Sequence, residues 1–369
     1  MCESLGKILV IRGGAIGDFI LTLPVLAALR LHFPRAQVEV LGYPHIVQLA
    51  LAGGLADQVR SIEARALAGF FAPRNELDGE LAGYFASFNL IISYLYDPDE
   101  FFRSNVARCS KAQFIIGPHR PDEAIDTHAT DVFLRPLERL AIFESDPIPR
   151  LRFGSELSPN SDATGASSKC ADAPVYGPRL RSRRGKEADR IVNTENPPPC
   201  LGGYRDLAPA AQGERLAACL ALHPGSGSDR KNWTEEKWAE LIGRLAEMTN
   251  LNFLLVGGEA EGGRLARLAA VLPNHRTQIA QSLPLVELAH HLQTSAIFAG
   301  HDSGISHLAA ALGLPGLVLW AHSNLSVWSP RSDRMSILRC EGELAHLPVP
   351  RVLEEIIELV NRLSEGPRR

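Results

Sequence analysis

The chain has 369 residues, of which 45% are hydrophobic and 22% charged, and its formal net charge is −4. This length exceeds the size at which a single hydrophobic core keeps growing, so two domains are expected. The composition is that of a globular protein and excludes a disordered or fibrous one. Lysines and arginines are spread along the whole chain, which excludes the one-sided basic surface of a nucleic-acid-binding protein.

The cysteines and the apolar runs indicate the compartment. The six cysteines are dispersed, with no C-x-x-C pair and no zinc-like spacing, which favours reduced thiols in the cytosol. The apolar run at 8–11 is too short for the core of a signal peptide, and no stretch approaches the roughly 20 apolar residues of a membrane span. We predict a cytoplasmic protein, and peripheral contact with the inner membrane stays open.

The first half, 1–150, alternates short β-branched runs with amphipathic stretches, which predicts an α/β domain with a parallel sheet. Its clearest strands are expected at 7–11, 37–41, 90–94 and 113–116, and its clearest helix at 18–32.

Residues 151–215 change to a composition rich in serine, proline, glycine, alanine and arginine, without hydrophobic periodicity. We interpret this segment as a disordered linker or insertion that joins two domains. Its basic cluster, residues 179–186, either contacts a membrane surface or is solvated.

The second half, 216–369, resumes the alternation and predicts a second α/β domain. Elements are expected at 216–222, 234–248, 252–256, 259–272, 284–293, 296–299, 304–312 and 316–319. An amphipathic helix at 352–363 closes the chain.

The first motif is a glycine-rich turn from strand to helix, Arg12-Gly13-Gly14-Ala15-Ile16-Gly17-Asp18. Glycines allow a tight turn and close approach of a ligand to the backbone. The G-x-G-x-x-G spacing of a dinucleotide site is absent, which makes an NAD-dependent oxidoreductase a weak alternative. Asp18 is either a general base at the mouth of the sheet or only a helix cap.

The second motif is a Gly/Ser loop after a strand, His223-Pro-Gly225-Ser226-Gly-Ser228, with Lys231 close behind. Backbone amides, hydroxyls and a lysine suit a diphosphate, although the spacing is not that of a Walker loop. The alternative is a plain flexible loop. Thr234 is a candidate N-cap, and Trp233 with Trp238 has the spacing of a hydrophobic staple.

The third motif, residues 300–308, follows an apolar strand and opens a helix of small residues. It places Asp302, Ser303, Gly304 and His307 where the helix dipole favours an anion. The alternative is a capped helix with a buried, hydrogen-bonded histidine, but the density of polar residues favours a ligand site.

The acidic stretch Asp97-Pro-Asp-Glu100 has carboxylates of the kind that bind hard cations. We interpret it as an acidic surface turn, with Asp97 as a candidate for the lining of an interdomain cleft.

Together these motifs resemble glycosyltransferase family 9, the ADP-heptose:lipopolysaccharide heptosyltransferases. The segments 8–24, 223–226 with 231–233, and 302–311 carry the resemblance in this order, which covers about 7–145 and 216–363. The resemblance implies a GT-B fold, an α/β arrangement of two Rossmann-like domains facing each other across a cleft, with acceptor on the first domain and donor on the second.

The resemblance also implies roles for individual residues in a metal-independent, inverting transfer without a cofactor. Asp18 matches the proposed base, beside an acceptor-side loop of Gly13, Gly14, Gly17 and Asp97. Lys231 matches the catalytic cation at the donor phosphates. The remaining donor contacts would come from Gly225, Ser226, Asp302, Ser303, Gly304 and His307. The implied donor is ADP-heptose, and the implied acceptor is a lipid-linked or core oligosaccharide of lipopolysaccharide biosynthesis.

Two departures from the family pattern affect these expectations. A Gly-Pro-Thr-like turn is replaced by Trp320-Ala-His-Ser-Asn324, at the expected nucleotide contacts, and a Gln-Gly pair is missing from 94–100, at the expected acceptor side. The alternatives are a family member with another nucleotide-sugar donor, and a non-catalytic homologue that binds a sugar nucleotide.

Overall fold

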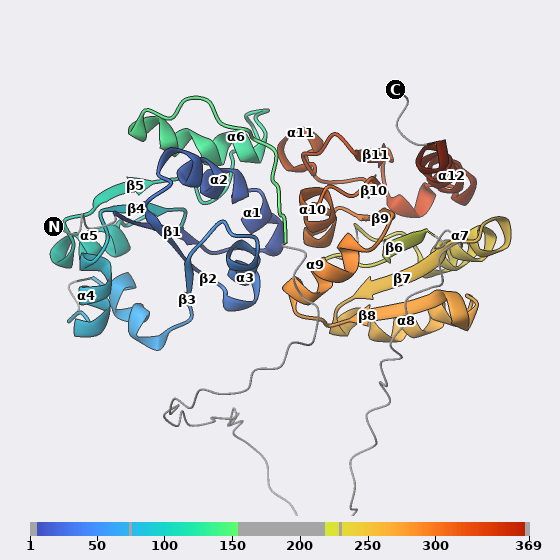
Figure 1. The fold of residues 1–369 in the computed structure, drawn as a ribbon, viewed down its shortest axis with the longest axis horizontal. Helices are drawn as coiled ribbons and strands as arrows, with labels where there is room; N and C mark the ends of the chain where they lie inside the picture. The colour runs from blue at the N-terminus through green and yellow to red at the C-terminus, as the bar shows by residue number, and fades with distance from the viewer. Residues whose placement is uncertain (1–5, 74–75, 154–217, 229–230, 366–369) are drawn as a thin grey trace, which may run out of the picture. The chain divides into compact units, whose positions relative to one another are not determined.

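Two parallel β-sheets flanked by helices make up the described part of the chain, which in this computed structural model is residues 6–73, 76–153, 218–228 and 231–365 (Figure 1). Most of the segment predicted as a linker, from residue 154 to 215, lies outside the described residues. Among the described residues, no helix is both long and apolar enough to cross a membrane.

The first sheet has five parallel strands in the order β3-β2-β1-β4-β5. The strands are β1 (Lys7–Arg12), β2 (Gln37–Gly42), β3 (Gln58–Ser61), β4 (Leu90–Ser93) and β5 (Gln113–Ile116). The helices are α1 (Ile16–Ile20), α2 (Leu23–His32), α3 (Pro44–Ala52), α4 (Gly79–Ala86), α5 (Phe101–Cys109) and α6 (Ala129–Leu134), with 3₁₀ helices η1 (Arg65–Phe71) and η2 (Arg135–Leu140).

The single helix predicted at 18–32 is wrong, because the chain forms two helices there, α1 and α2. Pro24 is the second residue of α2 and has no N–H to donate to a carbonyl of the preceding turn. The helix therefore ends at Ile20 and restarts at Leu23. This break leaves α1 as a short helix whose N-terminus directly follows the glycine-rich turn.

The second sheet has six parallel strands in the order β11-β10-β9-β6-β7-β8. They are β6 (Cys219–His223), β7 (Asn252–Gly257), β8 (Thr277–Gln281), β9 (Ile297–His301), β10 (Gly316–Trp320) and β11 (Met335–Arg339). Numbered from β6 and read from β8, the order is 3-2-1-4-5-6, which is that of the Rossmann fold.

The helices predicted in the second half are present at the expected places and differ at their ends, whereas the short helix at Leu325–Trp328 was not predicted. They are α7 (Glu235–Met248), α8 (Gly262–Ala269), α9 (Leu285–Gln293), α10 (Gly304–Ala311), α11 (Leu325–Trp328) and α12 (Val349–Glu365), with 3₁₀ helices η4 (Glu259–Glu261), η5 (Asn274–Arg276) and η6 (Leu344–His346). Thr234 caps α7 by accepting from the Lys237 N–H, and the buried rings of Trp233 and Trp238 pack with centroids 5.3 Å apart. The predicted cap and staple are confirmed.

Apolar side chains cover both faces of each central strand. Ile8 and Val10 of β1 enter one core, while Leu9 and Ile11 enter the core on the opposite face. Each fully buried side chain of this size contributes ~1.5–3 kcal/mol. The core that holds Ile8 and Val10 continues into α9 and α10 of the second half, and the described residues of the two halves form one compact unit.

Both sheets reverse their strand order beside a central strand, between β1 and β4 and between β6 and β9. Ligands of open α/β sheets bind outside the carboxyl ends of the strands at such a switch point. The loops that begin at Gly13 and Asp302 lie at these two points.

Candidate functional site

The loops at the two switch points line one cleft of about 900 Å³. Its lining includes most of the side chains and glycines singled out in the sequence, from both halves of the chain. These are Gly13, Gly14, Gly17, Asp18, Lys231, Asp302, Ser303, Gly304 and His307.

Asp18 is the third residue of α1, and its carboxylate serves the helix and reaches the cleft. Oδ2 accepts from the Ala15 N–H at 2.9 Å, which closes the first turn of α1. The side chain is still 28% exposed, and it lines the cleft. Gly14 adopts φ +102, and a Cβ there would meet Oδ2 at 2.8 Å, so this turn requires glycine. The position of Asp18 is therefore compatible with both interpretations, the helix cap and the general base.

Arg12 lies behind Asp18 as a buried cation. Its Nη2 is 3.7 Å from Asp18 Oδ1, and its Nη1 donates to the His119 carbonyl at 2.8 Å. The guanidinium also lies 4.5 Å from the ring centre of Phe133. Burial lowers the pKa of Arg12, and Asp18 opposes that shift. These contacts fix a positive charge next to the Asp18 carboxylate.

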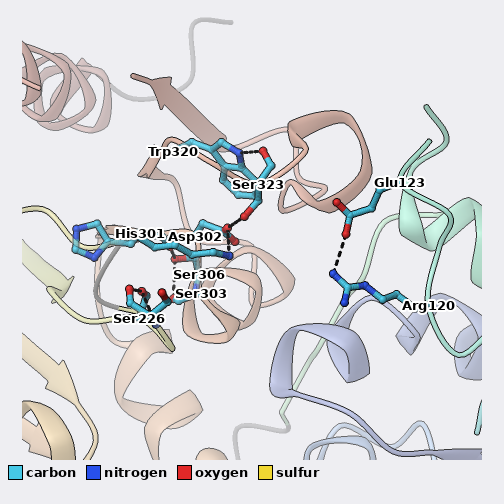
Figure 2. A network of polar contacts seen from close by, with 11 residues as sticks. Arg120, Glu123, Ser226, His301, Asp302, Ser303, Ser306, Trp320 and Ser323 are labelled. Carbon is cyan, nitrogen blue, oxygen red and sulfur yellow. Dashed lines mark hydrogen bonds and ion pairs between the residues drawn. The ribbon is translucent and has the colours of Figure 1, made fainter. Parts of the chain in front are cut away.

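Asp302 and Lys231 form the charged centre on the side of the second half. Lys231 Nζ lies 2.5 Å from Asp302 Oδ2, and the Ser323 hydroxyl donates to the same oxygen. The Asp302 side chain is only 12% exposed. Figure 2 shows Ser323 between Asp302 and Trp320, whose indole Nε1–H donates to the Ser323 carbonyl at 2.8 Å.

His301 joins the two ends of the loop that carries Lys231. Its Nε2 accepts from the Trp233 N–H at 2.9 Å, so the proton lies on Nδ1, which donates to the Gly225 carbonyl at 3.4 Å. Burial lowers the pKa of His301 to about 3, so the ring is neutral at physiological pH. The neutral His301 ring thus holds the loop by hydrogen bonds at Gly225 and Trp233, and Asp302 holds it through Lys231.

The start of α10 is capped within the third motif. Ser303 Oγ accepts from the Ser306 N–H at 3.3 Å and lies 3.2 Å from His223 Nδ1. The Ser306 hydroxyl donates to the His301 carbonyl. Burial lowers the pKa of His223 to about 4. This network connects the ends of β6 and β9 and leaves the first turn of α10 facing the cleft.

Two glycines bring α1 and α10 into contact at the cleft. A Cβ on Gly304 would lie 2.7 Å from Ile16 Cβ, and one on Gly17 would lie 3.2 Å from His307 Cδ2. His307 is buried, which lowers its pKa to about 4, while Asp302 and Asp18 act in the opposite direction. The helix that carries Asp18 therefore lies against the helix of the third motif.

Three of the predicted site residues are not among those that line the cleft. Gly225 packs against Glu261, whose Cγ a Cβ would meet at 2.7 Å, and the Ser226 hydroxyl donates within the loop to the Ser228 carbonyl at 2.8 Å. Asp97 lies in the loop before α5, and its carboxylate accepts from the N–H groups of Phe102 and Arg103 in the first turn of that helix at 3.2 and 3.0 Å. All three shape loops beside the cleft rather than its surface.

The sequence interpretation missed several lining residues, which form a wall of aromatic and charged side chains in the cleft. The wall includes Tyr96, His119, Arg120, Glu123 and Trp328. Arg120 pairs with Glu123 at 2.7 Å, as Figure 2 shows, and lies over the Trp328 ring. They come from the segment after β4, the segment between β5 and α6, and the end of α11, and no local motif marks them. Within the described ranges, no group of three or more His, Cys, Asp or Glu residues could hold a metal ion.

Contacts beside the cleft join the two halves directly. His128, at the start of α6, lies with Nε2 2.9 Å from the Ser329 carbonyl, and Arg331 pairs with Asp131 at 2.6 Å. Burial lowers the pKa of His128.

Two Rossmann-like domains that share a cleft at the carboxyl ends of their strands define the GT-B fold. The fold is confirmed by the solved structure of the glycosyl transferase family 9 from Veillonella parvula, with a TM-score of 0.68 at 15% identity, covering 96% of this chain and 97% of that one. The structure of Escherichia coli heptosyltransferase WaaC with ADP gives a TM-score of 0.62 at 15% identity, covering 96% and 99%.

Sequence comparison confirms the resemblance to a particular family within this fold. Residues 202–350 match the model of glycosyltransferase family 9 (heptosyltransferase). Lipopolysaccharide heptosyltransferase 1 of Pseudomonas aeruginosa is 34% identical over 128 residues, which are 34% of this chain and 36% of that protein. The match thus spans little more than a third of the length of this curated relative.

Proposed function

We propose that this protein is a glycosyltransferase that moves a sugar from a nucleotide-sugar donor to a hydroxyl of a glycan acceptor. One observation carries the proposal: Asp18 from the first half and Lys231 from the second line the same cleft. A carboxylate and an ammonium in one cleft are the groups needed to take up a proton and to stabilise a leaving diphosphate. The similarity to glycosyltransferase family 9 supports this assignment.

The proposed reaction is a single displacement with inversion. Asp18 takes the proton of the acceptor hydroxyl as its oxygen attacks the anomeric carbon of the donor. The bond between the anomeric carbon and the diphosphate oxygen breaks, and the nucleoside diphosphate leaves with that electron pair. Lys231 and the backbone amides at the start of α10 stabilise the negative charge that develops there. In this proposal Lys231 fills the role that a metal ion plays in other transferases.

The proposed donor is ADP-heptose, and the proposed acceptor is a lipopolysaccharide-core or lipid-linked oligosaccharide on the cytoplasmic side of the inner membrane. The names of similar proteins support both choices, since they include lipopolysaccharide heptosyltransferase 1 and a heptosyltransferase with ADP. A family member that uses another nucleotide sugar would keep the same cleft and reaction.

A binding panel tests the proposal and separates these donors. ADP-, UDP- and GDP-sugars are added in turn to the full chain, and thermal unfolding is recorded for each. We expect ADP-heptose to raise the unfolding temperature most, because a ligand that binds only the folded state stabilises it. A larger shift with a UDP- or GDP-sugar would indicate that this nucleotide sugar, and not ADP-heptose, is the donor. Binding without transfer or donor hydrolysis would indicate a non-catalytic sugar-nucleotide-binding protein, and no shift with any of them would contradict the proposal.

A further inference from the structure

The turn after β10, Trp320 to Asn324, contributes one polar side chain to the cleft, the hydroxyl of Ser323. The buried Trp320 indole donates to the Ser323 carbonyl at 2.8 Å, and the Cys340 N–H donates to the Trp320 carbonyl at 2.8 Å. The turn is therefore tied to the end of β10 and to its neighbour β11, which fixes where the Ser323 hydroxyl points.

The Ser323 hydroxyl donates to Asp302 Oδ2, the oxygen that Lys231 Nζ approaches to 2.5 Å. Hydrogen bonds to a charged group are stronger than those between neutral groups, and they hold the charged group in one orientation. Because the Asp302 side chain is only 12% exposed, water can contribute little to holding it. The rotamer of Asp302, and through it the position of Lys231, therefore depends on Ser323.

A diphosphate that binds at Lys231 would compete with Asp302 for the ammonium group. A buried carboxylate that loses part of its cationic partner needs another donor to remain charged. Ser323 is such a donor, and it contacts Asp302 independently of Lys231.

We propose that Ser323 is a positioning residue of the nucleoside-diphosphate subsite: it holds Asp302 so that Lys231 is presented to the diphosphate. This inference rests on the proposed function and names a residue that neither the sequence motifs nor the family comparison assigns. It also gives the unusual turn a role in ligand binding.

The test measures nucleoside-diphosphate binding, which does not require transfer. ADP, UDP and GDP are titrated into the full wild-type chain by calorimetry, and the tightest of them is used with the variants. We expect Ser323→Ala to weaken binding about five- to tenfold, which is less than the effect of losing one hydrogen bond to a charged group, because Ser323 acts on the diphosphate only through Asp302 and Lys231. Ser323→Thr keeps the hydroxyl and should bind as wild type. Ser332→Ala is the control: it removes a hydroxyl from the same segment between β10 and β11, but Ser332 is not among the residues that line the cleft. This variant should bind as wild type.

A double mutant separates positioning from a general structural effect. In a Lys231→Ala background, Ser323→Ala should change affinity by less than about twofold, because the two residues act through one contact. If Ser323→Ala does not fold, Ser323→Thr and Ser323→Val replace it. These two side chains have nearly the same shape, and only threonine carries a hydroxyl, so their affinities show the effect of the hydroxyl.

The possible results separate the two proposals. Unchanged binding in Ser323→Ala, or equal binding in the threonine and valine variants, overturns the inference alone. So does an undiminished effect of Ser323→Ala in the Lys231→Ala background. A wild-type chain that binds none of the three nucleotides overturns the proposed function, and this inference with it.

Discussion

At the scale of single residues, the Asp18 carboxylate does two things at once. One oxygen accepts from the Ala15 N–H and the other faces the Arg12 guanidinium, while the side chain remains partly open to the cleft. The same contacts that stabilise α1 therefore orient the proposed base. A base held in this way needs no rearrangement before it meets an acceptor hydroxyl.

Asp18→Asn should slow transfer strongly and spare the fold. The amide oxygen can still accept from the Ala15 N–H, but the side chain no longer takes up a proton. We expect kcat to fall about 10²- to 10⁴-fold, with the affinity for the nucleoside diphosphate unchanged. Steady-state kinetics and calorimetry measure the two quantities. Asp99→Asn, an exposed carboxylate of the same half, is the matched control and should behave as wild type. Near-normal turnover in Asp18→Asn would show that another group is the base.

Sequence reasoning predicted nine residues that line the cleft, because glycines, a lysine and an N-cap motif next to strand ends have local signatures. It missed the roles of Arg12 and Ser323. Arg12 ends an apolar strand, which is a weak signal for a buried cation, and its partner His119 is 107 positions away. Ser323 is a single hydroxyl residue in a turn without a recognisable motif, and only the folded chain brings it to Asp302. Their roles depend on contacts that no spacing along the chain reveals.

At the scale of elements, the contact between α1 and α10 depends on small residues. Gly17 and Gly304 lie where the two helices approach, and a side chain on Gly304 would collide with Ile16 and with the backbone nitrogen of Gly17. The helix pair places the proposed base and the proposed donor turn next to each other. The glycines of these motifs therefore serve packing in addition to any ligand contact.

Gly304→Ala should separate these helices. The added Cβ would lie 2.7 Å from Ile16 Cβ and 3.1 Å from the Gly17 nitrogen, and overpacking of this kind costs about 1–3 kcal/mol. We expect a lower free energy of unfolding, measured in urea, and reduced transfer. Gly83→Ala lies in α4 with no atom within 4 Å of the new Cβ, and it should be neutral or stabilise the fold by up to about 1 kcal/mol. Equal stability of the two variants would contradict the role of the close approach.

The strands that sequence reasoning missed share one property. β3, β8 and β11 are all edge strands of their sheets, and each is short and partly exposed. An edge strand has fewer buried positions than a central strand, so its sequence carries little of the apolar pattern that marks β1 or β9. The break between α1 and α2 was missed for a different reason, because the apolar face continues across Pro24.

At the scale of the whole molecule, three neutral histidines are buried around the cleft. Burial lowers the pKa of His223, His301 and His307 to about 4, 3 and 4, whereas the unfolded chain has the ordinary value near 6.5. Below about pH 6.5 the unfolded chain therefore binds protons that the folded chain does not. The free energy of unfolding should be level above this pH and fall as the pH drops towards 4.

Urea unfolding at pH 7.5 and pH 5.5 measures this loss. We expect about 1 kcal/mol per histidine for each pH unit below about 6. His301→Asn should reduce the dependence on pH, whereas His275→Ala, at an exposed position, should leave it unchanged. Equal stability at the two pH values would show that these histidines are protonated in the folded chain.

The central claim is that one cleft joins a base from the first half to a diphosphate-binding lysine from the second. The most direct test incubates the full chain with ADP-heptose and a lipopolysaccharide-core acceptor that lacks heptose, and identifies the product by mass spectrometry and its anomeric configuration by NMR. We predict that the wild-type chain adds one heptose with inversion. Asp18→Asn should form product at least about 100-fold more slowly while still binding ADP, and Lys231→Ala should lose most of the activity and bind ADP more weakly. Product with retained configuration, or full activity in either variant, would contradict the claim.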